Sequence, residues 1–336
     1  MNYKKILLGG ACVSMWIVLG VATTWAAAAL YFDVRISWLQ LPLASSYALG
    51  ILVVWIFVRR PRKIIFTLAG FLIVLAWWLS LQPSNTRDWQ PDVAVLPYAD
   101  INHDQVTIHN IRNCDYRTET DYTVRLYDKT FALDQLRTVD MYLVTWGSPH
   151  IAHTMISFGF TSGDYVCFSI ETRKQIGQEY SAVKGLFRQF EVTYVVADER
   201  DLVRLRTNYR KDEEVFLYRL QVTPAAGQKL FLDYLRRVNE LHERAVWYNA
   251  LTDNCTTGIR AQRAAADRAP WNWRMLLNGH LDELLYMHGM IVTNLPFAEL
   301  KTNSNINARA KAAPVADFPE AIRKGLPGFV EALPAK

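Results

Sequence analysis

Cysteine is scarce in this 336-residue sequence, and its distribution limits what the thiols can do. Four cysteines occur, and three of them follow the apolar N-terminal third: Cys114, Cys167 and Cys255. In an oxidising compartment, an odd number leaves at least one thiol free or paired with another chain. A disulfide framework that uses every cysteine of this region within one chain is therefore excluded.

Charged residues are missing from three long stretches near the N-terminus, residues 6–32, 36–58 and 64–86. A run of about 20 apolar residues matches the thickness of the bilayer core when it forms a helix. We therefore predict three transmembrane helices and a membrane anchor that occupies residues 1–86.

Basic residues mark one side of these predicted helices. Lys4 and Lys5 precede the first, and the motif RRPRK at residues 59–63 separates the second from the third. The positive-inside rule puts both groups in the cytoplasm, so the chain from about Arg87 onward is expected to lie outside it. The alternative for the first stretch is a signal peptide cleaved near TWAAAAL, and the later stretches would still export the domain.

The rest of the chain lacks an excess of positive charge. Residues 1–86 contain seven basic residues and one acidic residue, and the whole chain carries +5, so the remainder is near −1. Nucleic acid is not an expected partner of such a domain, because the basic excess reports membrane topology.

The exported part reads as an α+β domain, an antiparallel sheet with helices gathered towards its C-terminal end. It follows a polar linker at residues 87–104. Segments rich in β-branched and aromatic residues predict the strands: QVTIHNIR, DYTVRLYD, VDMYLVTW, IAHTMISFGF, YVCFSIETR, FEVTYVV and EEVFLYRLQV. Thr223 and Pro224 predict the start of a helix. The Ala-, Pro- and Asn-rich tail, residues 301–336, is expected to be loosely ordered.

Cys255 lies in YNALTDNCTTGIR, between a polar turn and a segment that favours a helix. A thiol at a helix N-terminus faces unpaired backbone N–H groups and the positive end of the helix dipole, and both favour the thiolate. Cys255 is therefore a candidate nucleophile, with Asp253 or Thr252 as the cap. The alternative is a small buried residue that closes a turn.

His153 is the candidate base. It lies in a predicted strand that leads into the turn TSG, where Gly163 suits the left-handed conformation of a three-residue loop. That loop pairs Phe160 with Asp164 and, counting back, His153 with Glu171, whereas a two- or four-residue loop would put Thr172 opposite His153. Cys255, His153 and Glu171 then form a nucleophile, base and orienting residue. The alternative for His153 is an ordinary hydrogen-bonded histidine of the sheet.

Several stretches of the chain closely resemble the periplasmic Lnb-type domain, a family linked to lipoprotein N-acylation. They are IAHTMISFGF, SIETRK, YSAVKGLFRQFEVTYVVADERDLVRLRTNYR, VFLYRLQV and YNALTDNCTT, and the resemblance covers roughly residues 105–290. It implies a circularly permuted papain-like thiol fold at residues 105–300, in a protein of the bacterial inner membrane. The predicted membrane helices of this chain precede the domain, whereas the described N-acyltransferases carry theirs after it.

The resemblance implies a cysteine acyltransferase in which Cys255 and His153 match the catalytic pair and Glu171 is the third member. A membrane phospholipid would donate an acyl chain to Cys255, and an amine such as a lipoprotein N-terminus would accept it. The backbone N–H of Cys255 and the side chain of Asn254 would stabilise the oxyanion. This chemistry calls for no metal or other cofactor.

Four arginines are candidate ligands for a phosphate head group: Arg173, Arg204, Arg206 and Arg210. The competing interpretation of the charged run from ADERD onward is a solvated, salt-bridged turn and helix. His150 and His153 are three apart on a strand and point to opposite faces, which disfavours a shared metal. Trp146 and Trp247 either flank an acyl groove or belong to an aromatic core.

Two rival functions remain open at this stage. A cysteine peptidase or amidase acting on cell-wall peptide would use the same Cys255 and His153, with peptide in place of lipid. A binding or assembly protein of the envelope would need neither residue for its function.

Overall fold

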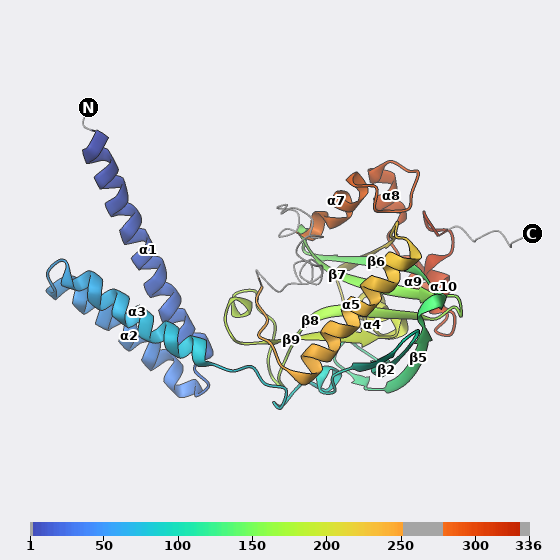
Figure 1. Cartoon of the computed structure of the whole chain (residues 1–336), viewed down its shortest axis with the longest axis horizontal. Coiled ribbons are helices and arrows are strands. Elements are labelled where there is room, and N and C mark those ends of the chain that lie inside the picture. Colours follow the sequence, from blue (N-terminus) through green and yellow to red (C-terminus); the bar gives the residue numbers. More distant parts are fainter. Residues whose placement is uncertain (1–2, 251–277, 330–336) are drawn as a thin grey trace, which may run out of the picture. The chain divides into compact units, whose positions relative to one another are not determined.

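The computed structural model describes residues 3–250 and 278–329 of the chain (Figure 1). The chain divides into two compact units. The first contains the chain up to Pro83 together with Tyr180–Phe190, and the second contains Ser84–Glu179 and the chain from Glu191 onward.

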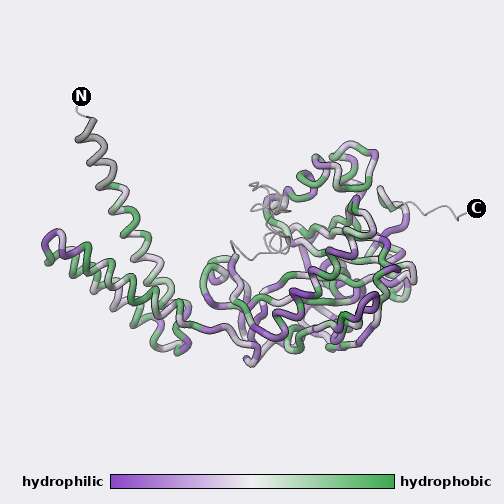
Figure 2. The backbone as a smooth tube through the Cα atoms, in the orientation of Figure 1, coloured by the Kyte–Doolittle hydropathy of each residue, from purple (hydrophilic) through white to green (hydrophobic). Residues whose placement is uncertain are grey.

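Three apolar helices make up most of the first unit: α1 (Tyr3–Asp33), α2 (Ser37–Phe57) and α3 (Arg62–Ser80). Each has the length and composition to cross a membrane, with mean hydropathies of 1.7, 1.7 and 1.9. Figure 2 shows hydrophobic residues along all three helices, and few of their side chains are buried. The predicted apolar helices are confirmed, although the third ends at Ser80, before the uncharged stretch does.

One mixed sheet forms the centre of the second unit. Its strand order is β1-β2-β9-β8-β7-β6-β10, with β5 paired on β2. Every pair is antiparallel except β2 with β9. The strands are β1 (Tyr98–Asn102), β2 (Gln105–Arg112), β5 (Leu126–Ala132), β6 (Leu136–Trp146), β7 (Ser148–Phe160), β8 (Tyr165–Arg173), β9 (Glu191–Ala197) and β10 (Glu213–Arg219). A separate pair comprises β3 (Asp115–Tyr116) and β4 (Tyr122–Thr123). The predicted α+β class is confirmed.

Helix α5 (Pro224–Glu243) lies across one face of this sheet (Figure 1). It begins as the sequence predicts, because Thr223 Oγ1 accepts a hydrogen bond from Ala226 N–H at 3.2 Å and Pro224 takes the first helical position. Its buried Phe231 packs edge-on against Phe158 of β7, with ring centroids 5.0 Å apart. Aromatic side chains thus join the helix to the middle of the sheet.

Helices from two distant segments cover the opposite face. Val144, Met155 and Leu217 of the strands form one core cluster with Leu202 and Phe318 of these helices. Among the residues that the structure describes, the second unit also contains the helical elements η1 (Pro91–Val93), η2 (Leu133–Gln135), α4 (Glu199–Arg204), the π-helix η4 (Leu205–Tyr209), η7 (Asn278–His280), α7 (Leu281–Met287), α8 (Phe297–Asn303), α9 (Asn307–Ala312) and α10 (Phe318–Arg323). Successive side chains of a strand point to opposite faces of the sheet. The odd-numbered residues of β7, such as Met155, therefore face away from α5 and towards α4 and η4.

The tail is folded over residues 301–329, against the expectation from its composition. It forms the end of α8, then α9 and α10, and its residues Ile306, Ala310 and Ile322 have no exposed surface. The expected linker is likewise part of the fold, since β1 joins the sheet and Trp89 is buried. The Ala- and Pro-rich composition of the tail predicted disorder. Its few larger apolar residues nevertheless lie where they pack against the sheet.

The ADERD motif is buried and structural, not solvated. Asp198 caps α4 by accepting a hydrogen bond from Arg200 N–H at 2.8 Å. Asp201 has no exposed surface and binds the Arg112 guanidinium of β2 through two hydrogen bonds of 2.9 Å. Glu199, also fully buried, binds Arg323 at 2.6 and 2.7 Å.

Arg323 ties the tail to the core, because its Nε also donates to Asp140 Oδ2 at 2.9 Å. Replacing Arg323 with alanine would leave the fully buried carboxylates of Asp140 and Glu199 short of a cation. We expect the free energy of unfolding to fall by about 3–5 kcal/mol, measured by urea titration of the full chain in detergent.

The control is Arg236→Ala, since Arg236 is 61 % exposed and pairs with Asp233 on the surface of α5. Its cost should stay below about 1 kcal/mol. Equal costs for the two variants would contradict a stabilising role of the tail.

Candidate functional site

The hairpin of β7 and β8 sets the register of the site. Phe160 N–H donates to Asp164 O at 2.9 Å, and Gly163 has a φ of +81°. The register continues to Met155 opposite Ser169. This is the three-residue loop that the sequence predicts, and it brings His153 and Glu171 together as expected.

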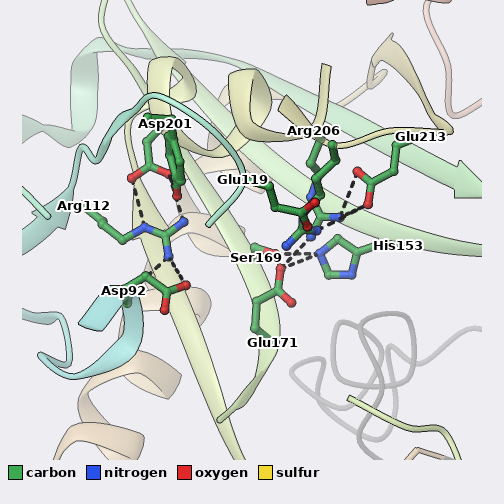
Figure 3. Close-up of polar contacts among 11 residues, drawn as sticks. Asp92, Arg112, Glu119, His153, Ser169, Glu171, Asp201, Arg206 and Glu213 are labelled. Atoms are coloured by element: carbon green, nitrogen blue, oxygen red, sulfur yellow. Dashed lines mark hydrogen bonds and ion pairs between the residues drawn. The ribbon is translucent and has the colours of Figure 1, made fainter. Parts of the chain in front are cut away.

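His153 is 8 % exposed and its Nε2 faces β8 (Figure 3). That nitrogen lies 2.6 Å from Ser169 Oγ and 3.1 Å from Glu171 Oε1. Ser169 Oγ in turn donates to Glu171 Oε1 at 2.6 Å. The three side chains belong to one face of the sheet, since Ser169 and Glu171 are two residues apart on β8.

Arg206 also contacts the carboxylate of Glu171 (Figure 3). It comes from the π-helix η4, is 5 % exposed and donates from Nη2 to Glu171 Oε1 at 2.8 Å. Its Nη1 is 3.4 Å from both carboxylate oxygens of Glu213 on β10. Arg210 contacts the same Glu213 at 3.3 Å and also Glu119 at 3.1 Å. Glu171 therefore ends a chain of alternating charges.

The contacts of Nε2 indicate which nitrogen of the neutral imidazole carries the proton. An ionised Glu171 can only accept hydrogen bonds, so the Ser169 hydroxyl donates a hydrogen bond to Glu171. Its oxygen can then accept one from His153. Nε2 of His153 must then carry the N–H. In the neutral ring Nδ1 is consequently the basic nitrogen, and it points away from Glu171 (Figure 3).

Glu171 is strongly biased towards the ionised form. Burial by itself would raise the pKa of this carboxyl. The positive charges of His153 and Arg206, with hydrogen bonds from His153 and Ser169, outweigh that effect and hold the pKa well below its usual range. The site thus contains a permanent negative charge next to the imidazole.

The sequence comparison supplies the family. Residues 122–279 match the model of the Lnb N-terminal periplasmic domain. This region is an Lnb-type periplasmic domain. Comparisons with curated proteins and with solved structures return no match. With its three apolar helices, the chain is a membrane-anchored protein with a periplasmic domain; the cytoplasmic N-terminus and the permuted papain-like fold stay predictions.

The matched region is smaller than the folded unit. β1 and β2 precede it, and α8, α9 and α10 follow it, yet all of them belong to the unit that contains the Lnb-type domain. Cys255 and Asn254 lie within the matched range but outside the residues that the structure describes. Their catalytic roles stay predictions.

The other two thiols of the exported part are poor nucleophiles. Cys114 and Cys167 are both free and buried. Burial, with the neighbouring Asp201 carboxylate, raises the pKa of Cys114 to about 12. Burial also raises the pKa of Cys167 well above its ordinary value. With pKa values raised in this way, both thiols remain protonated near neutral pH. Their role in the Lnb-type domain is therefore that of buried packing residues.

The four arginines expected at a lipid head group make internal contacts. Arg173 donates to Val93 O at 2.9 Å and stacks 4.3 Å from the Trp89 ring, and burial lowers its pKa to about 10. Arg204 lies 5.9 Å from the Tyr209 ring. Arg206 and Arg210 belong to the charge chain described above. Head-group binding by any of them stays a prediction.

Three residues of the site escaped the sequence analysis: Ser169, Glu213 and Glu119. Ser169 could have been found, because it precedes Glu171 by two residues and shares its face of the strand. Glu213 and Glu119 could not, because only the folding of η4 against the sheet brings them to Arg206 and Arg210.

Trp146 is the residue of β6 that pairs with Glu213 of β10, and it also pairs with Ser148 at the start of β7. Trp146 is 40 % exposed and lines a cavity of about 250 Å³ together with Pro149 and Lys301. His150 Nδ1 is 2.8 Å from His280 Nε2, so its contact is with η7. Among the residues that the structure describes, no group of three His, Cys, Asp or Glu side chains could hold a metal ion.

The lowered pKa of Glu171 predicts how stability depends on pH. A depressed folded-state pKa stabilises the fold above the unfolded value, near 4.5, and this contribution disappears as the pH falls further. The free energy of unfolding of Glu171→Gln should therefore fall less than that of the wild type between about pH 5 and about pH 3. Urea titrations of the full chain in detergent across this range measure it.

The control is Glu179→Gln, which changes an exposed carboxyl and should leave the wild-type pH dependence intact. A Glu171→Gln curve parallel to that of the wild type would show that the carboxylate is not selectively stabilised by its neighbours.

Proposed function

We propose that this chain is a membrane-anchored periplasmic cysteine acyltransferase that moves an acyl chain from phospholipid to an amine. The observation that carries the proposal is the buried His153, whose Nε2 lies 2.6 Å from Ser169 Oγ and 3.1 Å from Glu171 Oε1. A weak nucleophile is activated by an adjacent general base that a third group, here a carboxylate, holds in orientation. The Lnb-type domain and the apolar helices support a lipid substrate.

In the first half-reaction, His153 Nδ1 takes the proton of the Cys255 thiol. The thiolate attacks the carbonyl carbon of a phospholipid ester, and the Cys255 N–H with the Asn254 side chain stabilises the oxyanion. The C–O bond then breaks, the glycerol oxygen receives the proton from His153, and a lysophospholipid leaves. Cys255 retains the acyl chain as a thioester.

In the second half-reaction, an amine attacks the thioester carbonyl, and the N-terminus of a lipoprotein is the acceptor we propose. His153 accepts a proton from the attacking nitrogen as the C–N bond forms. The C–S bond breaks, and the proton returns to the sulfur of Cys255. The products are an amide and the regenerated thiol, so protons and electrons balance over the cycle.

Glu171 contributes in both half-reactions through the imidazole. Each half-reaction passes through a protonated His153, and an ionised carboxylate 3.1 Å away stabilises that cation. Arg206 keeps Glu171 ionised and in place from η4. Glu171 and Arg206 are thus positioning residues for the base.

The thioester can be observed directly. We expect full-length protein incubated with phospholipid vesicles to gain the mass of one acyl chain, and hydroxylamine to remove it. Cys255→Ala should show no gain, while the control Cys167→Ala should retain it, because Cys167 is a buried core residue. Intact-protein mass spectrometry measures all three.

Other outcomes would favour the rival functions. A thiol that labels rapidly with iodoacetamide at neutral pH but forms no lipid adduct would indicate a peptidase or amidase. A thiol that labels slowly and forms no adduct would indicate a binding or assembly protein.

The positioning role of Glu171 has its own kinetic signature. Glu171→Gln replaces a charge-assisted contact, worth about 1.5–3 kcal/mol, so adduct formation should slow about 10- to 100-fold. The acid limb of the rate profile should also move to lower pH, because the imidazolium loses its neighbouring anion. The exposed Glu214→Gln should change neither quantity. A slower Glu171→Gln with an unshifted profile would point to a merely structural role.

A further inference from the structure

The segment Tyr180–Phe190 belongs structurally to the membrane helices, although it is inserted into the sheet of the other unit. The chain leaves the sheet at the end of β8, forms the short helix η3 (Lys184–Leu186) and returns at β9. Its residues cluster with α1, α2 and α3 in the first unit. We call this segment, residues 180–190, the β8–β9 insertion.

Three consecutive residues attach the β8–β9 insertion to the helices. Phe187 is 6 % exposed, and its ring centroid lies 5.0 Å from that of Phe32 at the end of α1. Gln189 Nε2 donates to Phe32 O at 2.6 Å and to Asp33 Oδ1 at 2.8 Å. Each contact is made at the last residues of α1, where the apolar span ends.

Arg188 makes the corresponding contacts at α3. Its guanidinium lies 4.1 Å from the Trp78 ring, and its Nη1 donates to Leu81 O at 2.6 Å, just beyond the last residue of the helix. Since α1 and α3 both end at these contacts, the β8–β9 insertion lies at the level where the hydrocarbon core gives way to head groups. Trp25, Trp77 and Trp78 pack in the same cluster, and tryptophan is enriched at this level.

The remaining side chains of the β8–β9 insertion combine exposed apolar surface with positive charge. Tyr180 is 49 % exposed, Val183 54 % and Leu186 38 %. Lys184 lies among them in η3. Exposed aliphatic and aromatic residues next to a lysine are the composition of segments that lie in a bilayer interface.

We propose that the β8–β9 insertion is a second membrane contact, with Val183 and Leu186 in the leaflet of phospholipids that surrounds the ends of α1 and α3. The partner is the phospholipid bilayer itself. The proposal rests on the membrane-spanning helices and not on acyl transfer. It adds that the chain after β8, the strand that carries Ser169 and Glu171, reaches lipid within a few residues of its end.

The test places an environment-sensitive probe at position 183. The full chain carries Cys12→Ala and Cys255→Ala, which leaves only the buried Cys114 and Cys167, and a single Val183→Cys labelled with a nitrobenzoxadiazole dye. The matched control is Val315→Cys in the second unit, where the valine is 51 % exposed. Both proteins are reconstituted in phosphatidylcholine nanodiscs, and peptide mapping verifies the labelled position.

We expect the emission at position 183 to be blue-shifted, to be lost when the acyl chains are brominated, and to resist aqueous iodide. The probe at position 315 should behave oppositely. Iodide quenching at both positions would overturn the proposal, and protection from both quenchers at position 183 would indicate a protein partner instead. Since Cys255 is absent, the result is independent of the proposed acyl transfer.

Discussion

A charge that leaves water must meet an opposite charge, and the second unit depends on how residues 198–210 meet this constraint. Glu199 binds Arg323 of the tail, Asp201 binds Arg112 of β2, and Arg206 binds Glu171 of β8. Glu199 and Asp201 are fully buried. One short segment thus supplies a buried partner to three elements that are far apart in sequence.

The same segment links stability to the candidate site. Because Arg206 follows α4 within the π-helix η4, its position depends on the packing of that helix against the sheet. Arg206 positions Glu171, and Glu171 with Ser169 orients His153. The distant tail therefore supports α4, and through it Arg206, since α10 packs on α4 through Phe318 and Arg323.

Much of the site could be predicted from short-range pattern. The turn residue Gly163 suits a three-residue loop, that loop sets one register, and the register brings His153 to Glu171. The helix start at Thr223 and Pro224 follows equally from local capping chemistry. Arg206 was given a different role, as a head-group ligand, because a sequence does not show which arginine a fold will bury.

The sequence by itself determined the three apolar helices and the β7–β8 hairpin, because each follows from residues close together in the chain. It left two partners open for His153, and the structure selected Glu171 over Thr172. Only the tertiary structure decided that the tail is folded, that the acids of ADERD are buried, and that residues 180–190 join the membrane helices. The reason is that long-range burial selects among many possible partners. Phe187 and Arg323 meet theirs, Phe32 and Glu199, across more than a hundred residues of chain.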